Sequence, residues 1–413
     1  MDAARALGGP QWLAHRRAAA AQRFISSALP TPSEEAWRYS RIDELDLDRY
    51  RPVAGGDWPE TRSEVARAGW VLAVNGAVVH TELDESLEAK GVELRDFATD
   101  EEAPEGLGAC ADSSADAFVH LNDAFTPGGA YIRVPDGVVV EGTIVVEHWN
   151  AGTGVASFPR TVVVAGRDSE VSVLERFGSA TGEQLVVPVT ELVVGDAARL
   201  RYLGFQDHGP QVWQLGLLRA VAGRDATVRS SAVALGGDYA RLRSEALLAG
   251  TGASSEMVAV YFAHESQMLD FRTLQDHDAD HTTSDLLFKG AVEDEARSVY
   301  SGLIHLRKTA SRANAAQTNR NLVLSEGSAA LSIPNLEIET DDVKCSHAST
   351  VGPIDTDQLY YLESRGVPPE AAERLIVFGF FEDVISRLPL ATLQGRLRAA
   401  VARKFEARRC CHA

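Results

Sequence analysis

The sequence predicts a mainly β protein, a β-helix or related β-solenoid flanked by N-terminal and C-terminal α-helical segments. Short β-branched segments bounded by Gly, Asp or Asn follow one another from Ala117 to about Ile338. An apolar strand, a glycine and a polar turn recur there at Gly166, Gly195, Gly223 and Gly250, in steps of 29, 28 and 27 residues. Such a period is typical of stacked rungs, whereas the strands of a sandwich carry no fixed period. The alternative is an ordinary all-β domain with coincidental glycine spacing.

The composition bounds the number of domains and argues against a nucleic-acid partner. The 413 residues suffice for two or three domains and for a large core without disulfides or metals. The 59 Asp and Glu residues against 40 Lys and Arg give a formal charge of -19, which repels a phosphate backbone. No basic patch offsets that charge, so we expect no nucleic-acid partner.

Cysteine usage and hydropathy indicate the compartment. The four cysteines, Cys110, Cys345, Cys410 and Cys411, are too few for a disulfide framework in this chain and indicate a reducing environment. Charges recur throughout the N-terminal stretch, unlike in a signal peptide, and no segment approaches the roughly 20 apolar residues that span a bilayer. We expect a cytoplasmic protein with no membrane partner.

The first elements along the chain are helical. The stretch from Gln11 to Phe24 is rich in Ala, Arg and Leu, contains no Gly or Pro, and predicts a helix. Pro30 and Pro32 end it, because proline disfavours helix at the residue before it. A short turn from Ser33 then leads into AWRYSRIDEL. We assign residues 1–60 to an N-terminal helical region.

Residues 61–115 form a small α/β lead-in to the repeats. GWVLAVNGAVVH predicts a β-hairpin, because Asn75-Gly76 suits a tight turn between Val-rich arms. The acidic stretch from Asp96 to Ser114 predicts a loop. Residues 116–350 then form the β-helix core, with looser copies of the glycine repeat at Gly290 and Gly327.

Residues 351–413 return to helix. Asp355 is placed to cap a helix, with Gln358 three residues later as in a capping box, and Gly366 closes that helix. Pro368-Pro369 starts a second helix, and LATLQGRLRAAVARKFEAR predicts a third.

The second of these helices carries much apolar surface. Its predicted stripe repeats every four residues through Ile376, Phe380, Val384 and Leu388. The apolar surface is widened by Leu375, Phe378 and Phe381. We expect it to pack on the end of the solenoid or on another protein.

Several catalytic signatures are missing from the sequence. It contains no G-x-x-x-x-G-K-[ST] P-loop, no G-x-G-x-x-G after a strand, no H-E-x-x-H, no G-x-S-x-G and no C-x-x-C. Nucleotide hydrolysis through a P-loop is therefore not expected.

Three clusters of cysteine or histidine residues remain as candidate sites. Cys345-Ser346-His347 follows the last β-type segment, LEIETDDV, and on a strand its Cys and His would share one face. Both are donors suited to iron, zinc or copper, yet two ligands cannot close a tetrahedral site. On spacing alone, a buried Cys beside a hydrogen-bonded His is the favoured interpretation; any metal there needs ligands from elsewhere in the chain or from a partner.

The other two clusters carry less information. QDHDADHTTSD, with His277 and His281 among four aspartates, could bind a cation, but its spacing supports only a solvated loop between strands. Cys410-Cys411-His412 stands at the end of the sequence, where residues are usually disordered, and adjacent cysteines do not easily chelate one ion. We interpret that cluster as incidental.

At this point the residues resemble a known family. The stretch QTNRNLVLSEGSAALSIPNLEIETDDVKCSHASTVGPIDTDQLYYLESRGV is similar to the C-terminal signature of the SufB/SufD family, the scaffold subunits of the SUF iron–sulfur cluster assembly machine. The resemblance extends through HTTSDLLFKGAVEDEARSVYSG, LNDAFTPGGAYIRVPDGVVVEGTIVV and PSEEAWRYS, and so covers nearly the whole chain.

Within the family the chain is most similar to the SufD branch. DDVKCSH-x-x-TVG is the SufD-like form, and residues 317–322 lack the sulfur-accepting cysteine of the SufB branch. The N-terminal cysteine cluster of many SufB chains is also missing. One departure is Ala348-Ser349, where SufD sequences commonly show Gly-Ala; both pairs are small.

The resemblance implies a right-handed parallel β-helix and a function without catalysis. It implies a SufB-like scaffold partner and a SufC-like ABC ATPase that docks on the C-terminal helices, for which we name Phe378, Phe381, Arg365 and Glu382. It also implies a transient iron–sulfur cluster at the interface with the scaffold partner, held by His347, with Cys345 as the weaker ligand.

Two rival interpretations stay open at this stage. One is a SufB-like or homodimeric scaffold built from this chain alone. The other is a β-helix carbohydrate-active enzyme that uses Asp276, Asp278 or Asp280, an analogy at the level of fold only. Such enzymes tend to be exported and to line their clefts with aromatic residues, and this chain is 7% aromatic.

Overall fold

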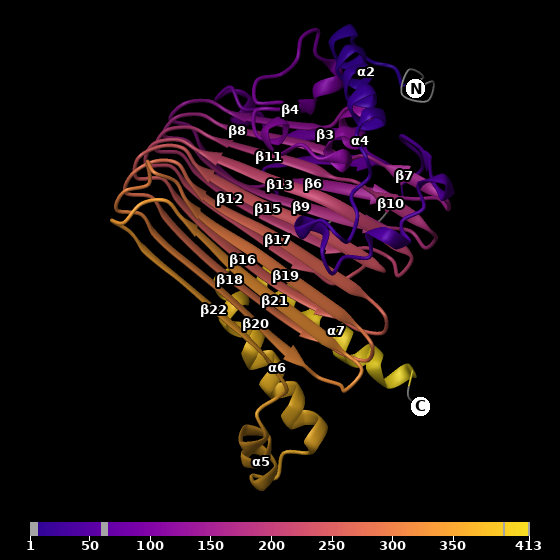
Figure 1. Cartoon of the computed structure of the whole chain (residues 1–413). Coiled ribbons are helices and arrows are strands. Elements are labelled where there is room, and N and C mark those ends of the chain that lie inside the picture. The colour runs from indigo at the N-terminus through magenta and orange to yellow at the C-terminus, as the bar shows by residue number, and fades with distance from the viewer. Residues whose placement is uncertain (1–6, 59–64, 391–392, 412–413) are drawn as a thin grey trace.

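The computed structural model describes residues 7–58, 65–390 and 393–411 and confirms the mainly β class. Its parallel strands alternate between two sheets along the chain, so the chain winds into a β-solenoid with helices at both ends (Figure 1). The predicted boundary between residues 60 and 61 lies outside the described residues.

The two sheets stack the rungs in chain order. Sheet A contains, from the C-terminal end, β21 (Ala329–Ile338), β19 (Arg297–Leu306), β17 (Met268–His277), β15 (Tyr239–Leu248), β13 (Val212–Ala222), β11 (Val189–Val194), β8 (Arg160–Ala165), β5 (Ala130–Val134) and β4 (Glu93–Asp96), with β1 (Arg51–Pro52), β7 (Val155–Ser157) and β10 (Gln184–Val186) beside this path. Sheet B contains β22 (Lys344–Gly352), β20 (Asn314–Val323), β18 (Thr283–Val292), β16 (Ser254–Ala263), β14 (Thr227–Ala234), β12 (Arg199–Asp207), β9 (Glu170–Ser179), β6 (Val139–Asn150), β2 (Gly69–Val74) and β3 (Ala77–Leu83).

Parallel pairing holds each rung in register with the next. Trp213 pairs with Tyr239, Tyr239 with Met268, Met268 with Arg297, and Arg297 with Ala329. The residue numbers of these successive partners differ by 26, 29, 29 and 32. The solenoid predicted from a glycine period of 27 to 29 residues is therefore confirmed, with rungs that lengthen toward the C-terminal end.

The glycine repeat marks one corner of the solenoid. Gly166, Gly195, Gly223 and Gly250 lie where the chain turns from sheet A to sheet B, and each approaches the backbone of the rung before it. The predicted copies at Gly290 and Gly327 are wrong. Gly290 lies inside β18, where a Cβ would be 1.8 Å from the Tyr261 ring, and Gly327 lies at the opposite corner, near Asp294.

Side chains in each strand alternate between a lumen and an outer face. The lumen is filled by apolar residues along most of its length, in two clusters that share Leu242 at their margins. At the N-terminal end the lumen is closed by Leu87 of α3 (Glu85–Glu88) and by Val92, both of which are buried in the first cluster. The predicted hairpin is confirmed: β2 and β3 pair antiparallel around Asn75 and Gly76, both with positive φ.

The strands do not begin at Ala117, as the sequence led us to expect. Ala117–Phe125 is helix α4, and the first strand after it is β5. Asp116 caps this helix by accepting hydrogen bonds from the backbone N–H groups of Phe118 and Val119, each 3.0 Å long. Apolar residues occur in this segment at helical as well as alternating spacing. A short apolar run of this kind fits a strand as well as a helix, and the prediction of a strand was wrong.

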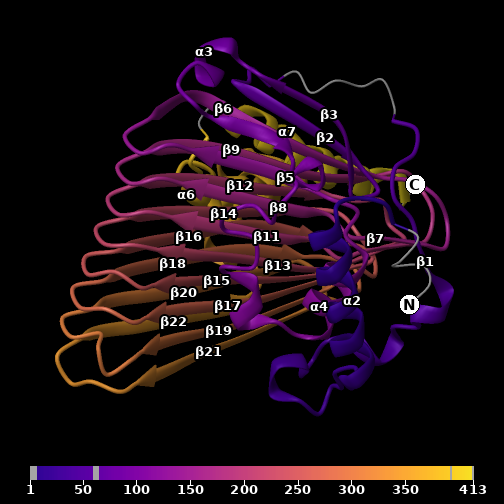
Figure 2. The same cartoon turned by 90° about the horizontal axis from the view of Figure 1, so that it is seen from above.

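The N-terminal helices cover sheet A. The predicted helix is confirmed as α2 (Gln11–Ser26), which packs on α4, and Figure 2 shows both beside the strands of sheet A.

The acidic stretch after Asp96 is largely a loop, and it is anchored by Glu191 of β11. Its carboxylate accepts hydrogen bonds of 2.9 to 3.0 Å from the backbone N–H groups of Gly108, Cys110 and Ala111.

The first two C-terminal helices begin where the sequence predicts. Asp355 caps α5 (Thr356–Ser364), Gly366 follows it with a φ of +85°, and α6 (Pro369–Ile385) starts at the proline pair. The third helix is α7 (Gln394–Cys411). Figure 1 shows α5 projecting beyond the last rungs, whereas α6 and α7 pack on the outer face of sheet B.

The buried stripe of α6 differs from the predicted one. Val377, Phe381, Val384 and Leu388 face sheet B, whereas Ile376 and Phe380 are only partly buried. A step of four residues turns the helix by about 40° beyond a full circle, so a stripe built only from such steps drifts off one face. Alternating steps of four and three keep the stripe on the face that packs against the solenoid.

Candidate functional site

The candidate site lies at the C-terminal end of the solenoid, on its last rung. The predicted Cys-x-His motif does not follow the last strand, as the sequence suggested, but lies on that strand, β22. Cys345 pairs with Ala315 of β20, and His347 pairs with Gln317. Because Ala315 and Gln317 are buried, Cys345 and His347 share the lumen side of sheet B, as the two-residue spacing predicts.

Cys345 is the more buried of the two donors. It packs against an apolar cluster that includes Leu306 and Ala315, next to Val343. This partial burial raises the pKa of the Cys345 thiol. A raised pKa keeps the sulfur protonated at neutral pH, and the protonated form is a poor nucleophile and a poor metal ligand.

His347 is exposed because no further rung covers it. Within the part of the chain that the structure describes, neither Cys345 nor His347 belongs to a group of three side chains close enough to hold one metal ion. Two protein ligands leave a tetrahedral metal site half filled. An ion or cluster bound at His347 would therefore need ligands beyond the described side chains.

The aspartates and histidines of QDHDADH do not converge on one point. Asp276 faces outward and accepts two hydrogen bonds from Arg307, of 2.9 and 2.7 Å. His277 is buried in the lumen, with its ring nitrogens 2.7 Å from Thr282 Oγ1 and 2.8 Å from Ser284 Oγ. Burial lowers the pKa of His277 to about 4, so it is neutral at physiological pH.

The rest of that segment lies at the surface. Asp280 accepts a hydrogen bond from Thr251 and lies 3.0 Å from the ring of His281, and the nearby Asp285 pairs with Arg387. This arrangement matches the solvated turn that the spacing favours. The carboxylates bind their neighbours rather than face one another across a cleft, so the geometry lends no support to the carbohydrate-active alternative.

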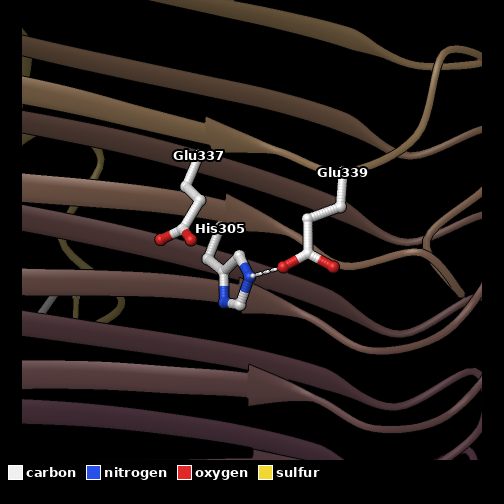
Figure 3. Close-up of side chains that lie close together, drawn as sticks. All are labelled: His305, Glu337 and Glu339. Carbon is white, nitrogen blue, oxygen red and sulfur yellow. Dashed lines mark hydrogen bonds and ion pairs between the residues drawn. The ribbon is translucent and has the colours of Figure 1, made fainter.

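A different cluster, which sequence reasoning missed, lies on the outer face of the last rungs of sheet A. His305 of β19 stands between the carboxylates of Glu337 on β21 and Glu339 just after it (Figure 3). One donor atom from each side chain lies within 4.8 Å of the other two. The residues are about one rung apart in sequence, so the only available signal was the strand register, which the glycine period does not specify residue by residue.

The residues predicted to bind the ATPase have mixed exposure. Phe381 is fully buried beside Phe262, so its side chain attaches α6 to the solenoid and offers no surface to a partner. Phe378 is partly buried and packs near Phe405 of α7. Glu382 forms an ion pair with Arg398, which joins α6 to α7.

The aromatic surface exposed at this end lies on α5 instead. Tyr360 is 73% exposed and Tyr361 is 57% exposed. The predicted Arg365 lies beside them, with its guanidinium carbon 5.1 Å from the centre of the Tyr361 ring. A contact surface formed by these three residues was not apparent from the sequence, where the buried phenylalanines of α6 were the stronger apolar signal.

The third predicted cluster is only partly described. Cys410 and Cys411 are the last residues of α7, and His412 lies outside the described residues. None of the helices within the described ranges is both long enough and apolar enough to cross a membrane.

Comparison with known proteins gives a consistent result. Residues 148–380 match the family model described as "SUF system FeS cluster assembly, SufBD core domain". The iron–sulfur cluster assembly protein SufD of Bacillus subtilis is 27% identical over 96% of this chain and 95% of its own length. The protein of the same name from Escherichia coli is 25% identical over 93% of this chain and 91% of its own length.

Mycobacterial relatives match at higher identity over a shorter stretch. An iron–sulfur cluster assembly SufBD family protein of Mycobacterium tuberculosis is 38% identical over 52% of this chain. That match spans 56% of the relative, so the chain aligns with little more than half of its length.

Proposed function

The chain belongs to the SufBD family of the SUF iron–sulfur cluster assembly system, and from that premise we propose that it is a SufD-type scaffold subunit. It pairs with a SufB-like chain, recruits a SufC-like ABC ATPase and catalyses no reaction itself. The nascent iron–sulfur cluster is cargo that both scaffold chains hold in the cytoplasm.

The observation that carries this proposal is the exposed His347 on an uncovered last rung. An imidazole is a good ligand for iron, and the described side chains around it do not complete a site. A second scaffold docked on the rung would supply the missing ligands. Cys345 is the weaker candidate, because burial raises the pKa of its thiol.

The edges of the last rung support pairing with a second scaffold. Among the described strands, β21 pairs only with β19 and β22 pairs only with β20, so each offers unpaired backbone groups on one side. Leu331 on β21 and Val351 on β22 are each 42% exposed. Such edges bind another strand readily.

The C-terminal helices support recruitment of the ATPase. Tyr360, Tyr361 and Arg365 form an exposed group of the residue types that dominate protein interfaces. Phe378 and Glu382 lie farther along the same helical unit. Phe381 acts through packing of α6 and touches no partner.

A tagged copy of the full chain, purified from its native host, tests the assembly. We expect a second, cysteine-richer scaffold chain and an ABC ATPase to be recovered with it. Recovery of this chain alone would support a homodimeric scaffold and contradict the proposal.

The role of His347 is tested in that complex, reconstituted by co-expression. We expect His347→Ala to lower the yield of iron and sulfide per complex severely, while both partners still co-purify. His80→Ala, a change to an exposed histidine on β3 at the opposite end of sheet B, is the matched control and should leave the yield unchanged. A wild-type cluster yield from His347→Ala would exclude the assigned role.

A further inference from the structure

The His305, Glu337 and Glu339 cluster is built by the register of three consecutive rungs. Asp276 of β17 pairs with His305 of β19, and His305 pairs with Glu337 of β21. Parallel in-register strands place such partners side by side on one face. The backbone register therefore gathers these three side chains on the outer face of sheet A, and Glu339 joins them from just after β21.

The histidine ring is oriented for coordination. Its Nδ1 lies 3.3 Å from Asp276 Oδ1, and its Nε2 lies 3.2 Å from Glu339 Oε1. A metal-binding histidine commonly donates its second ring N–H to a carboxylate, which fixes the tautomer and leaves the other nitrogen for the ion. Asp276 is buried and held in place by Arg307, so it can orient His305 in this way.

The carboxylates around the ring outnumber the cations. Arg307 forms two hydrogen bonds with Asp276 and also an ion pair with Asp278, so its single positive charge is shared by two carboxylates. Glu337 has no hydrogen bond or ion pair within the described part of the chain, and Glu339 Oε1 lies 3.2 Å from His305 Nε2. One divalent cation would balance the charges of the Glu337 and Glu339 carboxylates.

We propose that His305, Glu337 and Glu339 form a binding site for a divalent first-row transition metal such as Mn²⁺, Fe²⁺ or Zn²⁺. One imidazole nitrogen and two carboxylate oxygens match the ligand preference of these ions, whereas Ca²⁺ and Mg²⁺ prefer oxygen ligands alone. Water completes the coordination shell, since the two glutamates are exposed. The site is separate from His347, which lies on sheet B, and does not depend on the proposed scaffold function.

Mn²⁺ titration of the purified, metal-stripped full chain tests this site, with free Mn²⁺ followed by electron paramagnetic resonance. We expect one saturable site in the wild type. His305→Ala and Glu337→Gln should each weaken it by about tenfold or more. Glu337 is exposed and His305 is half-buried on the outer face rather than in the lumen, so these variants are expected to fold, and circular dichroism checks this.

Two further measurements separate a site from simple charge attraction. His281→Ala is the matched control, because His281 also lies beside an exposed carboxylate, Asp280, and it should bind Mn²⁺ like the wild type. An excess of Mg²⁺ should compete poorly, because it does not favour the imidazole. Equal binding by His305→Ala and wild type, or displacement of Mn²⁺ by equimolar Mg²⁺, would overturn the proposal.

Discussion

His277 shows how strand alternation separates neighbouring ionisable residues. Asp276 and His277 are adjacent in β17, yet the first binds Arg307 on the outer face and the second hydrogen-bonds to Thr282 and Ser284 in the lumen. The lumen position deprives the imidazole of water and lowers its pKa to about 4. His277 therefore has a structural role, and its lowered pKa makes the stability of the fold depend on pH.

The lowered pKa of His277 predicts how the free energy of unfolding changes with pH. The folded-state pKa of His277 lies below that of an unfolded histidine, about 6.5, so the unfolded chain binds more protons between these values. Stability is then lost as the pH falls through that window. Between pH 7.5 and pH 5 we expect the wild type to lose about 2 kcal/mol more than His277→Gln.

Urea unfolding of both proteins at the two pH values measures this difference. His208 is also buried, with a pKa lowered to about 4, but it is present in both proteins and cancels. Parallel pH profiles for the two proteins would show that His277 does not resist protonation.

At the scale of elements, the corner glycines explain the repeat. A Cβ at Gly250 would lie 2.1 Å from the backbone nitrogen of Arg224 on the rung before, a distance that no side-chain adjustment relieves. A Cβ at Gly379, inside α6, would meet no atom of another element within 4 Å. The first glycine allows rungs to approach, whereas the second only weakens a helix.

The two glycines should therefore respond oppositely to the same change. We expect Gly250→Ala to lower the free energy of unfolding by about 1–3 kcal/mol, because the backbone must move. Gly379→Ala should raise it by about 0.5–1 kcal/mol through helix propensity. Chemical unfolding of each variant checks both signs, and stabilisation by Gly250→Ala would contradict the close approach of the rungs.

The same elements show what the sequence can and cannot predict. Glycine spacing, the Asn75-Gly76 turn and the Asp355 cap are local signals, so the solenoid, hairpin and helix start followed from them. Helix α4 was missed because a short apolar run fits either period. The pairing of His305 with Glu337 depends on rungs of unequal length, which local signals do not fix.

At the scale of the whole molecule, the two ends of the solenoid differ. Leu87 and Val92 close the lumen at the N-terminal end, and the outermost strand there, β3, carries exposed polar residues such as His80 and Glu82. At the other end β21 and β22 present unpaired edges, with Cys345 and His347 on the last rung. Exposed charged or polar residues discourage strand addition, whereas exposed apolar residues such as Leu331 and Val351 permit it.

This difference predicts where a lysine disrupts assembly. We expect Leu331→Lys and Val351→Lys to weaken association with the second scaffold chain by about tenfold or more, equivalent to about 1.4 kcal/mol. Val139→Lys, a change on β6 at the opposite end, is the control, because Val139 is 49% exposed and thus equally tolerant of lysine. Analytical ultracentrifugation of mixtures with the second scaffold chain measures the effect; equal loss in all three variants would place the interface elsewhere.

The closed N-terminal end limits how many molecules can join. A stack of rungs with two bare ends would add copies without limit and grow into a fibre. Strands β3 and β4 are edges too, but Leu87 and Val92 cover the lumen there, so we expect each chain to join an end-to-end neighbour only through β21 and β22. We therefore expect end-to-end assembly to stop at a pair.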